Sequence, residues 1–221
     1  KPAFVAACGA AAEALAAETT TGPAVLIGLP WLEKGALHNA MALLDGGRIE
    51  TLRFKHDLPN YGVFDEKRVF TAGPAPGPIN FRGVRIGVPV CEDIWTADAC
   101  ECLAETGAEI LLVPNGSPYE AGKDDVRLNM VVARVTETGL PMAYLNQVGG
   151  QDELVFDGAS FALNADRSLA LQMPAFEEAL AITEWNRTQT GWHMAQGHCA
   201  RLPEREESIW QACVLGLRDY V

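Results

Sequence analysis

Apolar positions recur along this chain with two different periods, and the periods predict helices and strands in turn. Residues 2–18 are rich in alanine and repeat apolar side chains at helical spacing, which predicts an amphipathic helix. The apolar run 24–29 predicts a buried strand. Residues 37–44 and 48–54 predict two more strands, and the Asp45-Gly46-Gly47 link between them is a hairpin signal.

The second half of the chain alternates strand-type and helix-type patterns. We expect helices at about 94–106 and 122–138, and strands at 84–90, 109–113, 141–146 and near 154–163 and 168–172. This alternation predicts an α/β protein whose apolar strands are covered by helices. Residues 55–82 contain proline and glycine and form a long connection, which is a common place for functional residues.

The last segment, residues 203–221, predicts a helix. Pro203 suits its first turn, and three glutamates complement the positive end of the helix dipole. Its predicted apolar face consists of Ile209, Trp210, Cys213, Val214 and Leu217. The chain stops at Val221 without a glycine cap and with apolar side chains still emerging, so we expect a piece of a longer protein.

Composition bounds the class of protein. The 221 residues are enough for one well-filled domain, and 48% apolar and 21% charged residues are ordinary for a soluble globular protein. A net charge of −12 argues against nucleic acid or an anionic membrane as partner. No apolar stretch approaches the roughly 20 residues that span a bilayer.

The six cysteines show neither a disulfide framework nor a metal-binding pattern. They are scattered among apolar neighbours, which favours a reducing cytoplasm. His193, His198 and Cys199 lie near one another, but the remaining ligands of a tetrahedral site are missing at the usual spacing. We therefore expect no metal.

Cys91 is the candidate nucleophile. It ends the apolar run 84–90 and opens Glu92-Asp93-Ile94-Trp95, which predicts the start of a helix. The N-terminus of a helix carries partial positive charge and free N–H donors, and both stabilise a thiolate. The alternative is a buried, inert cysteine.

Four sequence blocks carry a family resemblance: Lys55 to Phe70, Gly87 to Trp95, Asn115 to Tyr119 and Asn146 to Gly158. In this order they resemble the nitrilase (carbon–nitrogen hydrolase) superfamily and, more narrowly, the glutamine-hydrolysing domain of bacterial glutamine-dependent NAD synthetases. The resemblance implies a four-layer α-β-β-α sandwich that dimerises. It also implies a hydrolase domain over residues 1–180 without its first strand, a linker over 181–202, and a helix from 203 leading to a synthetase domain absent from the chain.

The resemblance also implies a reaction. Cys91 would form a thioester with the γ-carboxyl group of glutamine and expel ammonia, and Lys55 and the N–H of Glu92 would stabilise the tetrahedral intermediate. Glu66 would orient Lys55, although a helix cap or a surface pair with Arg68 is an alternative. A lone lysine is otherwise a solvated surface charge.

The general base of the family is missing from this chain. Relatives carry a glutamate in a Phe-Pro-Glu-type motif at the end of an early strand, and no such motif is present. Glu13, Glu18, Glu33 and Glu50 all lie in the wrong context. We therefore expect the base upstream of Lys1 and the isolated chain to be catalytically impaired.

The candidate substrate-binding residues lie just beyond predicted strand ends, where open α/β sheets place ligands. They are Tyr61, Glu92, Trp95, Ser117, Tyr119 and Lys123. Glutamine carries an ammonium and a carboxylate group; Glu92 or Glu66 would bind the former and Lys123 the latter. Tyr61 in the core and Lys123 at an exposed helix start are the alternatives.

The expected partners follow from the same resemblance. They are L-glutamine, a synthetase domain of the same polypeptide and further copies of the chain. We expect no cofactor in this chain, and ATP and magnesium only in the absent domain. Two other functions stay open: a stand-alone hydrolase acting on another amide or N-carbamoyl compound, and a non-catalytic assembly module. Retention of both Cys91 and Lys55 argues against the module.

Overall fold

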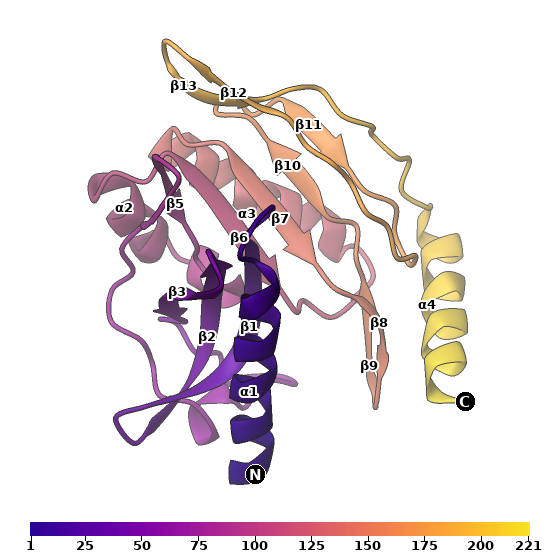
Figure 1. Ribbon diagram of the computed structural model, residues 1–221. Helices are drawn as coiled ribbons and strands as arrows, with labels where there is room; N and C mark the ends of the chain where they lie inside the picture. Colours follow the sequence, from indigo (N-terminus) through magenta and orange to yellow (C-terminus); the bar gives the residue numbers. More distant parts are fainter.

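The first two layers of the fold are a helix and a small sheet. The computed structural model describes residues 1–221 (Figure 1). Helix α1 (Pro2–Glu18) packs on a three-stranded antiparallel sheet in the order β1 (Val25–Glu33), β2 (Ala36–Asp45), β3 (Arg48–Phe54). The small side chains of Ala12 and Ala16 let the helix approach Leu29 and Leu44 closely. The predicted opening helix and the hairpin at Asp45-Gly46-Gly47 are confirmed.

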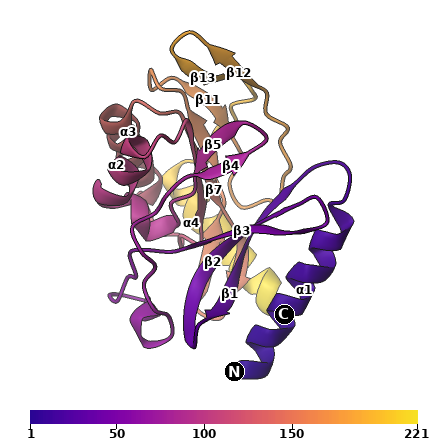
Figure 2. The same ribbon diagram turned by 60° about the vertical axis from the view of Figure 1, so that its left-hand side comes forward.

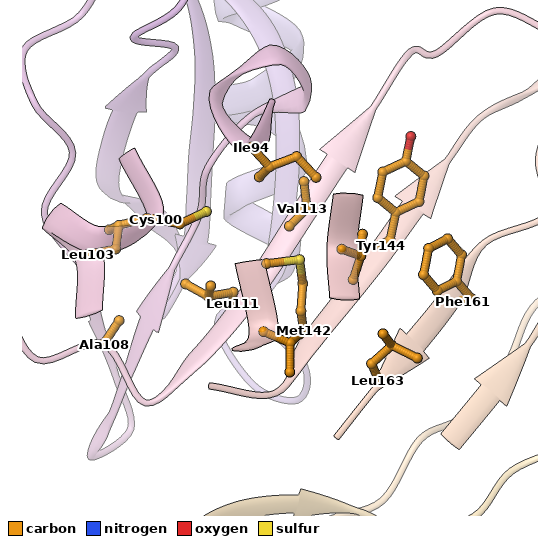
Figure 3. Packing of buried hydrophobic residues seen from close by; sticks show 12 residues of the cluster. Ile94, Cys100, Leu103, Ala108, Leu111, Val113, Met142, Tyr144, Phe161 and Leu163 are labelled. Carbon is orange, nitrogen blue, oxygen red and sulfur yellow. The ribbon is translucent and has the colours of Figure 1, made fainter. Parts of the chain in front are cut away.

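The other two layers are a larger sheet and its helices. The sheet has six strands in the order β11-β10-β7-β6-β5-β4, namely β4 (Ile79–Phe81), β5 (Val84–Gly87), β6 (Ile110–Asn115), β7 (Met142–Asn146), β10 (Phe161–Leu163) and β11 (Leu169–Gln172). Strands β5, β6 and β7 are parallel. Helices α2 (Asp98–Glu105) and α3 (Lys123–Thr138) cover its outer face through a cluster of 12 buried residues (Figure 3).

Strand β2 shows why the sheets stack. Side chains alternate between the two faces of a strand. Ala42 and Leu44 face α1, whereas Met41 and Leu43 pack against Ile79 of the larger sheet and against Val88, which follows β5. Figure 2 shows α1 on one side of the strands and α2 and α3 on the other. The predicted α-β-β-α sandwich is therefore confirmed.

Two hairpins and a helix complete the chain. They are β8 (Val148–Gln151) with β9 (Leu154–Asp157), β12 (Trp185–Thr188) with β13 (Gly191–Met194), and α4 (Arg205–Tyr220). Sequence patterns predicted a loop before residue 154 and the resemblance implied a linker over 181–202, so strand β8 and the hairpin β12–β13 were missed, whereas β9 lies within the predicted strand near 154–163. The strand predicted near 154–163 is two strands, because Gly158 and Ala159 between them adopt positive φ. The division into domains stays a prediction.

Helix α4 packs through a different face from the one that its large apolar side chains suggest. Trp210 is 70% exposed, and the other residues of the predicted apolar face, Ile209, Cys213, Val214 and Leu217, are exposed as well. The buried side chains are Ala212 and Leu215. A β-carbon on Gly150 would lie 3.0 Å from the α-carbon of Gly216, so small residues set this close contact with the β8–β9 hairpin.

The elements around Cys91 are shorter than predicted. Strand β5 ends at Gly87 rather than at residue 90, because Pro89 follows and cannot donate to a strand ladder. The helix predicted at 94–106 divides into a 3₁₀ turn, η2 (Cys91–Ile94), and α2. The long connection 55–82 holds the 3₁₀ turn η1 (Glu66–Arg68) and strand β4. None of the helices is long and apolar enough to cross a membrane.

Candidate active site

Cys91 occupies a strained backbone position at the first residue of η2. Its φ is +50°, in the left-handed region that side-chain-bearing residues rarely adopt. Such a conformation costs on the order of 1–3 kcal/mol and persists only where the surroundings hold it. The surroundings here are the packed contacts of Val88 and Val90 between the sheets.

Asp93 ties the Cys91 turn to the segment that carries Lys55. It is 1% exposed, and its Oδ2 accepts a hydrogen bond from the Val90 N–H at 2.8 Å. Its Oδ1 accepts from the N–H groups of His56 and Asp57 at 3.0 and 2.7 Å. Burial raises the pKa of Asp93, and these backbone donors act in the opposite direction. One carboxylate thus fixes the nucleophile relative to its neighbouring cation.

Lys55 is a buried cation just beyond the end of β3. It is 2% exposed, and its Nζ donates to Glu66 Oε2 at 2.8 Å. The other oxygen of Glu66 accepts a weaker bond from Asn39 Nδ2 at 3.4 Å. Glu66 therefore pairs with Lys55, and Arg68 pairs with Asp65 instead. An ammonium has three donors, so one bond to Glu66 leaves two for other acceptors.

The surroundings of Cys91 favour its thiol form over the thiolate. Burial raises its pKa above the ordinary value, and the nearby carboxylates of Glu92 and Glu66 add to that rise. The positive charge of Lys55 and the backbone N–H of Gly116 act in the opposite direction but do not cancel it. A thiolate rather than a thiol is the nucleophile, so the reaction needs a base.

Two cavities flank Cys91. One, which we call the reaction cavity, has a volume of about 520 Å³ and is lined by Lys55, Glu66 and Asn115 among others. The other, the outer pocket, has a volume of about 450 Å³ and opens to the surface. Because Cys91 lines both, a ligand in the outer pocket can reach the thiol from one side while Lys55 faces it from the other.

The outer pocket is lined by Glu92 and by a Lys123–Glu120 pair, and we call Glu92 its acidic end and Lys123 its basic end. Tyr61 donates from its hydroxyl to Glu92 Oε1 at 2.7 Å, and the pKa of Tyr61 is raised by loss of water around its hydroxyl and then by this carboxylate. Lys123 donates from Nζ to Glu120 Oε1 at 2.6 Å. Trp95, Ser117 and Val126 also line the pocket. Tyr61 and Trp95 are both exposed rather than in the core.

Tyr119 is the one predicted substrate contact that lines neither cavity. Its hydroxyl accepts a hydrogen bond from Ser208 Oγ of α4 at 2.9 Å. Its ring packs edge-on against Phe176 at a centroid distance of 5.4 Å. The structure therefore puts Tyr119 in the α4 interface, next to the pocket loop but pointing away from it.

The family follows from a comparison with known proteins. The model of the carbon-nitrogen hydrolase family matches residues 6–191, a span that includes Lys55, Cys91 and both cavities. This chain belongs to the carbon-nitrogen hydrolase family. The resemblance seen in the four sequence blocks is thereby confirmed.

Relatives within the carbon-nitrogen hydrolase family are more specific. A glutamine-dependent NAD(+) synthetase from Rhodobacter capsulatus is 48% identical over the whole chain, which spans 40% of that protein. The structure of glutamine-dependent NAD+ synthetase from Acinetobacter baumannii matches with a TM-score of 0.87 and 34% identity, covering 97% of this chain and 41% of that one. An amidase from Nesterenkonia sp. AN1, of the nitrilase superfamily, matches with a TM-score of 0.69, 26% identity and 78% coverage of this chain (65% of that one).

Sequence patterns missed the buried polar residues that support this hydrolase site. Arg127 of α3 is 2% exposed and pairs with Asp157 at the end of β9. A signal was present, because Arg127 is spaced at i, i+4 and i+8 with the buried Val131 and Val135. A charged residue on a core-facing helical stripe needs a buried partner.

Proposed function

We propose that this chain is the glutamine-hydrolysing part of a glutamine-dependent NAD synthetase. It cleaves the side-chain amide of L-glutamine through a thioester on Cys91, and the ammonia serves the amidation of deamido-NAD. The observation that carries the proposal is a half-buried Cys91 that shares one cavity with the buried Lys55 and lines a second pocket with Glu92 and Lys123. The names of the relatives support the choice of glutamine.

The proposed reaction takes place at Cys91, which lines both cavities. Cys91 Sγ attacks the amide carbon, a C–S bond forms, and the carbonyl oxygen becomes an oxyanion. The free donors of Lys55 stabilise that oxyanion, with the N–H of Glu92 as a second donor. Glu66 keeps Lys55 in place. The base takes the thiol proton during the attack and gives it to the nitrogen, so that the C–N bond breaks and ammonia leaves. Water then attacks the γ-glutamyl thioester, the C–S bond breaks, and glutamate and the free thiol are released.

The outer pocket positions the amino-acid end of glutamine. The α-ammonium lies at the acidic end beside Glu92 and Tyr61, where the carboxylate already accepts one hydrogen bond. The α-carboxylate lies at the basic end beside Lys123 and Ser117. Glu120 forms an ion pair with Lys123. Because the Glu120 side chain is exposed, it can turn into solvent and leave Lys123 to a substrate carboxylate.

The isolated chain is a poor glutaminase in this proposal. Each carboxylate that lines the two cavities already has a partner: Glu66 holds Lys55, Glu92 holds Tyr61, and Glu120 holds Lys123. In this proposal none of the three is the base for a thiol whose pKa is raised. The base is a further glutamate, as in the resemblance above.

Partners and setting complete the proposal. The exposed apolar face of α4 packs on a synthetase domain of the same polypeptide or on another copy. ATP and magnesium act in that synthetase domain and not in this chain. The reaction takes place in a reducing cytoplasm, where an unpaired nucleophilic thiol persists.

Protection of Cys91 tests the proposal. A chloromethyl ketone analogue of glutamine should alkylate Cys91, and L-glutamine should slow that alkylation in a concentration-dependent way, as read by intact mass and peptide mapping. Short aliphatic amides and N-carbamoyl amino acids should protect poorly. Better protection by either of these would favour the stand-alone hydrolase, and a Cys91 that never reacts would favour a non-catalytic module.

A further inference from the structure

Arg127 is a buried cation that the proposed reaction does not use. An arginine has five N–H donors, and each of its three nitrogens is hydrogen-bonded here. Both NH1 bonds go to Asp157, at 2.9 and 2.8 Å. The Nε donates to Ser117 Oγ at 3.1 Å, and NH2 donates to the carbonyl oxygens of Ser117 and Pro118 at 2.9 and 3.0 Å.

Stability alone is a weak reason for this ion pair. Removing two charges from water is expensive, and well-packed apolar residues of similar volume are often as stabilising as a buried pair. Arg127 continues the stripe of Val131 and Val135, where an apolar side chain would fit the pattern. The geometry around Ser117 offers a second reason.

The backbone of Ser117 makes three hydrogen bonds to buried side chains. Its N–H donates to Asn146 Oδ1 at 2.9 Å, and its carbonyl oxygen accepts from Asn146 Nδ2 at 3.1 Å as well as from Arg127. Asn146 is itself buried and bonded through its N–H to Ser160 Oγ at 2.9 Å. The residue at the inner wall of the outer pocket therefore cannot shift without breaking several bonds.

The hydroxyl of Ser117 is restricted as well. A serine oxygen has two lone pairs and one proton, and Arg127 Nε occupies one lone pair. Because an N–H of Arg127 points at this oxygen, the Ser117 proton points away from Arg127. Ser117 lines the outer pocket, so its proton can be donated to an acceptor bound there.

We infer that Arg127 is a positioning residue that sets substrate specificity: by occupying the lone pair of Ser117 and clamping the Ser117–Pro118 backbone, it makes the outer pocket select amides that carry a carboxylate. This rests on the proposed function, because it assumes that the α-carboxylate of the substrate lies beside Ser117. Arg127 itself does not touch the substrate. Its charge is neutralised by Asp157, so its effect passes through Ser117.

The test compares two electrophiles that differ only at the carboxylate. The glutamine-analogue chloromethyl ketone and its α-methyl ester are reacted with the purified chain, and the ratio of their second-order rate constants for Cys91 is measured. The unsubstituted chain should prefer the free acid. Arg127→Lys keeps the positive charge but loses the planar guanidinium group with its several N–H donors. It should lower the ratio of rate constants by about tenfold, which is the effect of losing a hydrogen bond to a charged group.

Further variants separate positioning from folding. Arg127→Met combined with Asp157→Leu removes the pair without leaving a lone buried charge, and it should lower the ratio like Arg127→Lys. Ser117→Ala should lower the ratio too, and adding Arg127→Lys to it should lower it little further. Arg134→Met, on the same helix and away from both cavities, is the matched control and should keep the ratio.

Each outcome decides a question. A ratio near one in the unsubstituted chain overturns the proposed carboxylate site and, with it, the proposed function. A strong preference that survives Arg127→Lys or Ser117→Ala overturns only the inference about Arg127. If the rate constants for both electrophiles and for iodoacetamide fall equally in the Arg127 variants, Arg127 has a general structural role. This outcome also overturns the inference about Arg127.

Discussion

The two buried ion pairs of this hydrolase, Lys55–Glu66 and Arg127–Asp157, have opposite characters. Both cations are 2% exposed. Lys55 makes one side-chain hydrogen bond and faces a cavity of about 520 Å³, whereas Arg127 makes five and faces none. Glu66 is 20% exposed and Asp157 only 7%.

In the proposed reaction, Lys55 takes part in the chemistry, whereas Arg127 holds neighbouring groups in place. Spare donors beside a nucleophile can be directed at charge that develops during reaction. Donors that are already hydrogen-bonded cannot act in this way, but they hold the groups to which they are bonded in place. Removing a partner should therefore affect stability at the Arg127 pair and rate at the Lys55 pair.

The largest expected effect is on stability, in Asp157→Ala. This change leaves the Arg127 charge buried without a partner, which should lower the free energy of unfolding by about 3–5 kcal/mol. Glu66→Gln is the matched comparison, because Glu66 is partly exposed and an amide can still accept from Lys55. It should cost much less in the same urea titration. Equal losses in the two variants would contradict the distinction.

The next effect is on rate, in Lys55→Met. With an activated γ-ester of glutamate, whose leaving group needs no proton, acylation of Cys91 should slow by about a hundredfold because an oxyanion donor is lost. Arg127→Lys should leave the acylation at saturating ester much closer to normal. The release of the coloured alcohol in a single turnover measures both. An unchanged rate in Lys55→Met would remove Lys55 from the mechanism.

A smaller effect is expected in the pH profile of Cys91. Because burial raises the thiol pKa in the folded chain, iodoacetamide labelling should still be rising above the ordinary cysteine pKa. Lys55→Met should move that rise to still higher pH, since the Lys55 charge lowers the pKa. Arg127→Lys keeps its charge and should not move it. A profile centred below the ordinary cysteine value would contradict the role of burial.

The smallest effect concerns Ser208→Ala, which removes the donor to Tyr119. One lost neutral hydrogen bond should lower the free energy of unfolding by about 0.5–1.5 kcal/mol. The preference for the free acid over its ester should remain, since Tyr119 lines neither cavity. A large loss of preference would mean that the α4 contact sets the position of the pocket loop.

Local patterns predicted most of the elements but not the contacts between them. The opening helix, the β2–β3 hairpin and α3 follow from periodicity and turn residues. The packing face of α4 did not, because close approach of Gly216 to Gly150 overrides the larger apolar stripe of the helix. The hairpins β8–β9 and β12–β13 are short, and their patterns are weak.

The residues of the site also divide into those that the sequence predicted and those that it did not. Cys91, Lys55 and Glu66 lie in sequence blocks that resemble a family, and the structure brings them to one cavity. Asp93 and Arg127 act through bonds to residues 30 or more positions away, such as His56 and Asp157. No local pattern specifies such partners. Tyr119 lies in a matching block, yet tertiary contacts with Phe176 and Ser208 turn it from the pocket.

The most direct test of the account is to find the covalent intermediate. The chain is mixed with the activated γ-ester of glutamate, quenched in acid and examined by intact mass and peptide mapping. We predict a γ-glutamyl group on Cys91, nearly absent in Lys55→Met and present in Arg127→Lys at saturating ester. An adduct on another cysteine, or one as abundant in Lys55→Met as in the unsubstituted chain, would contradict the account.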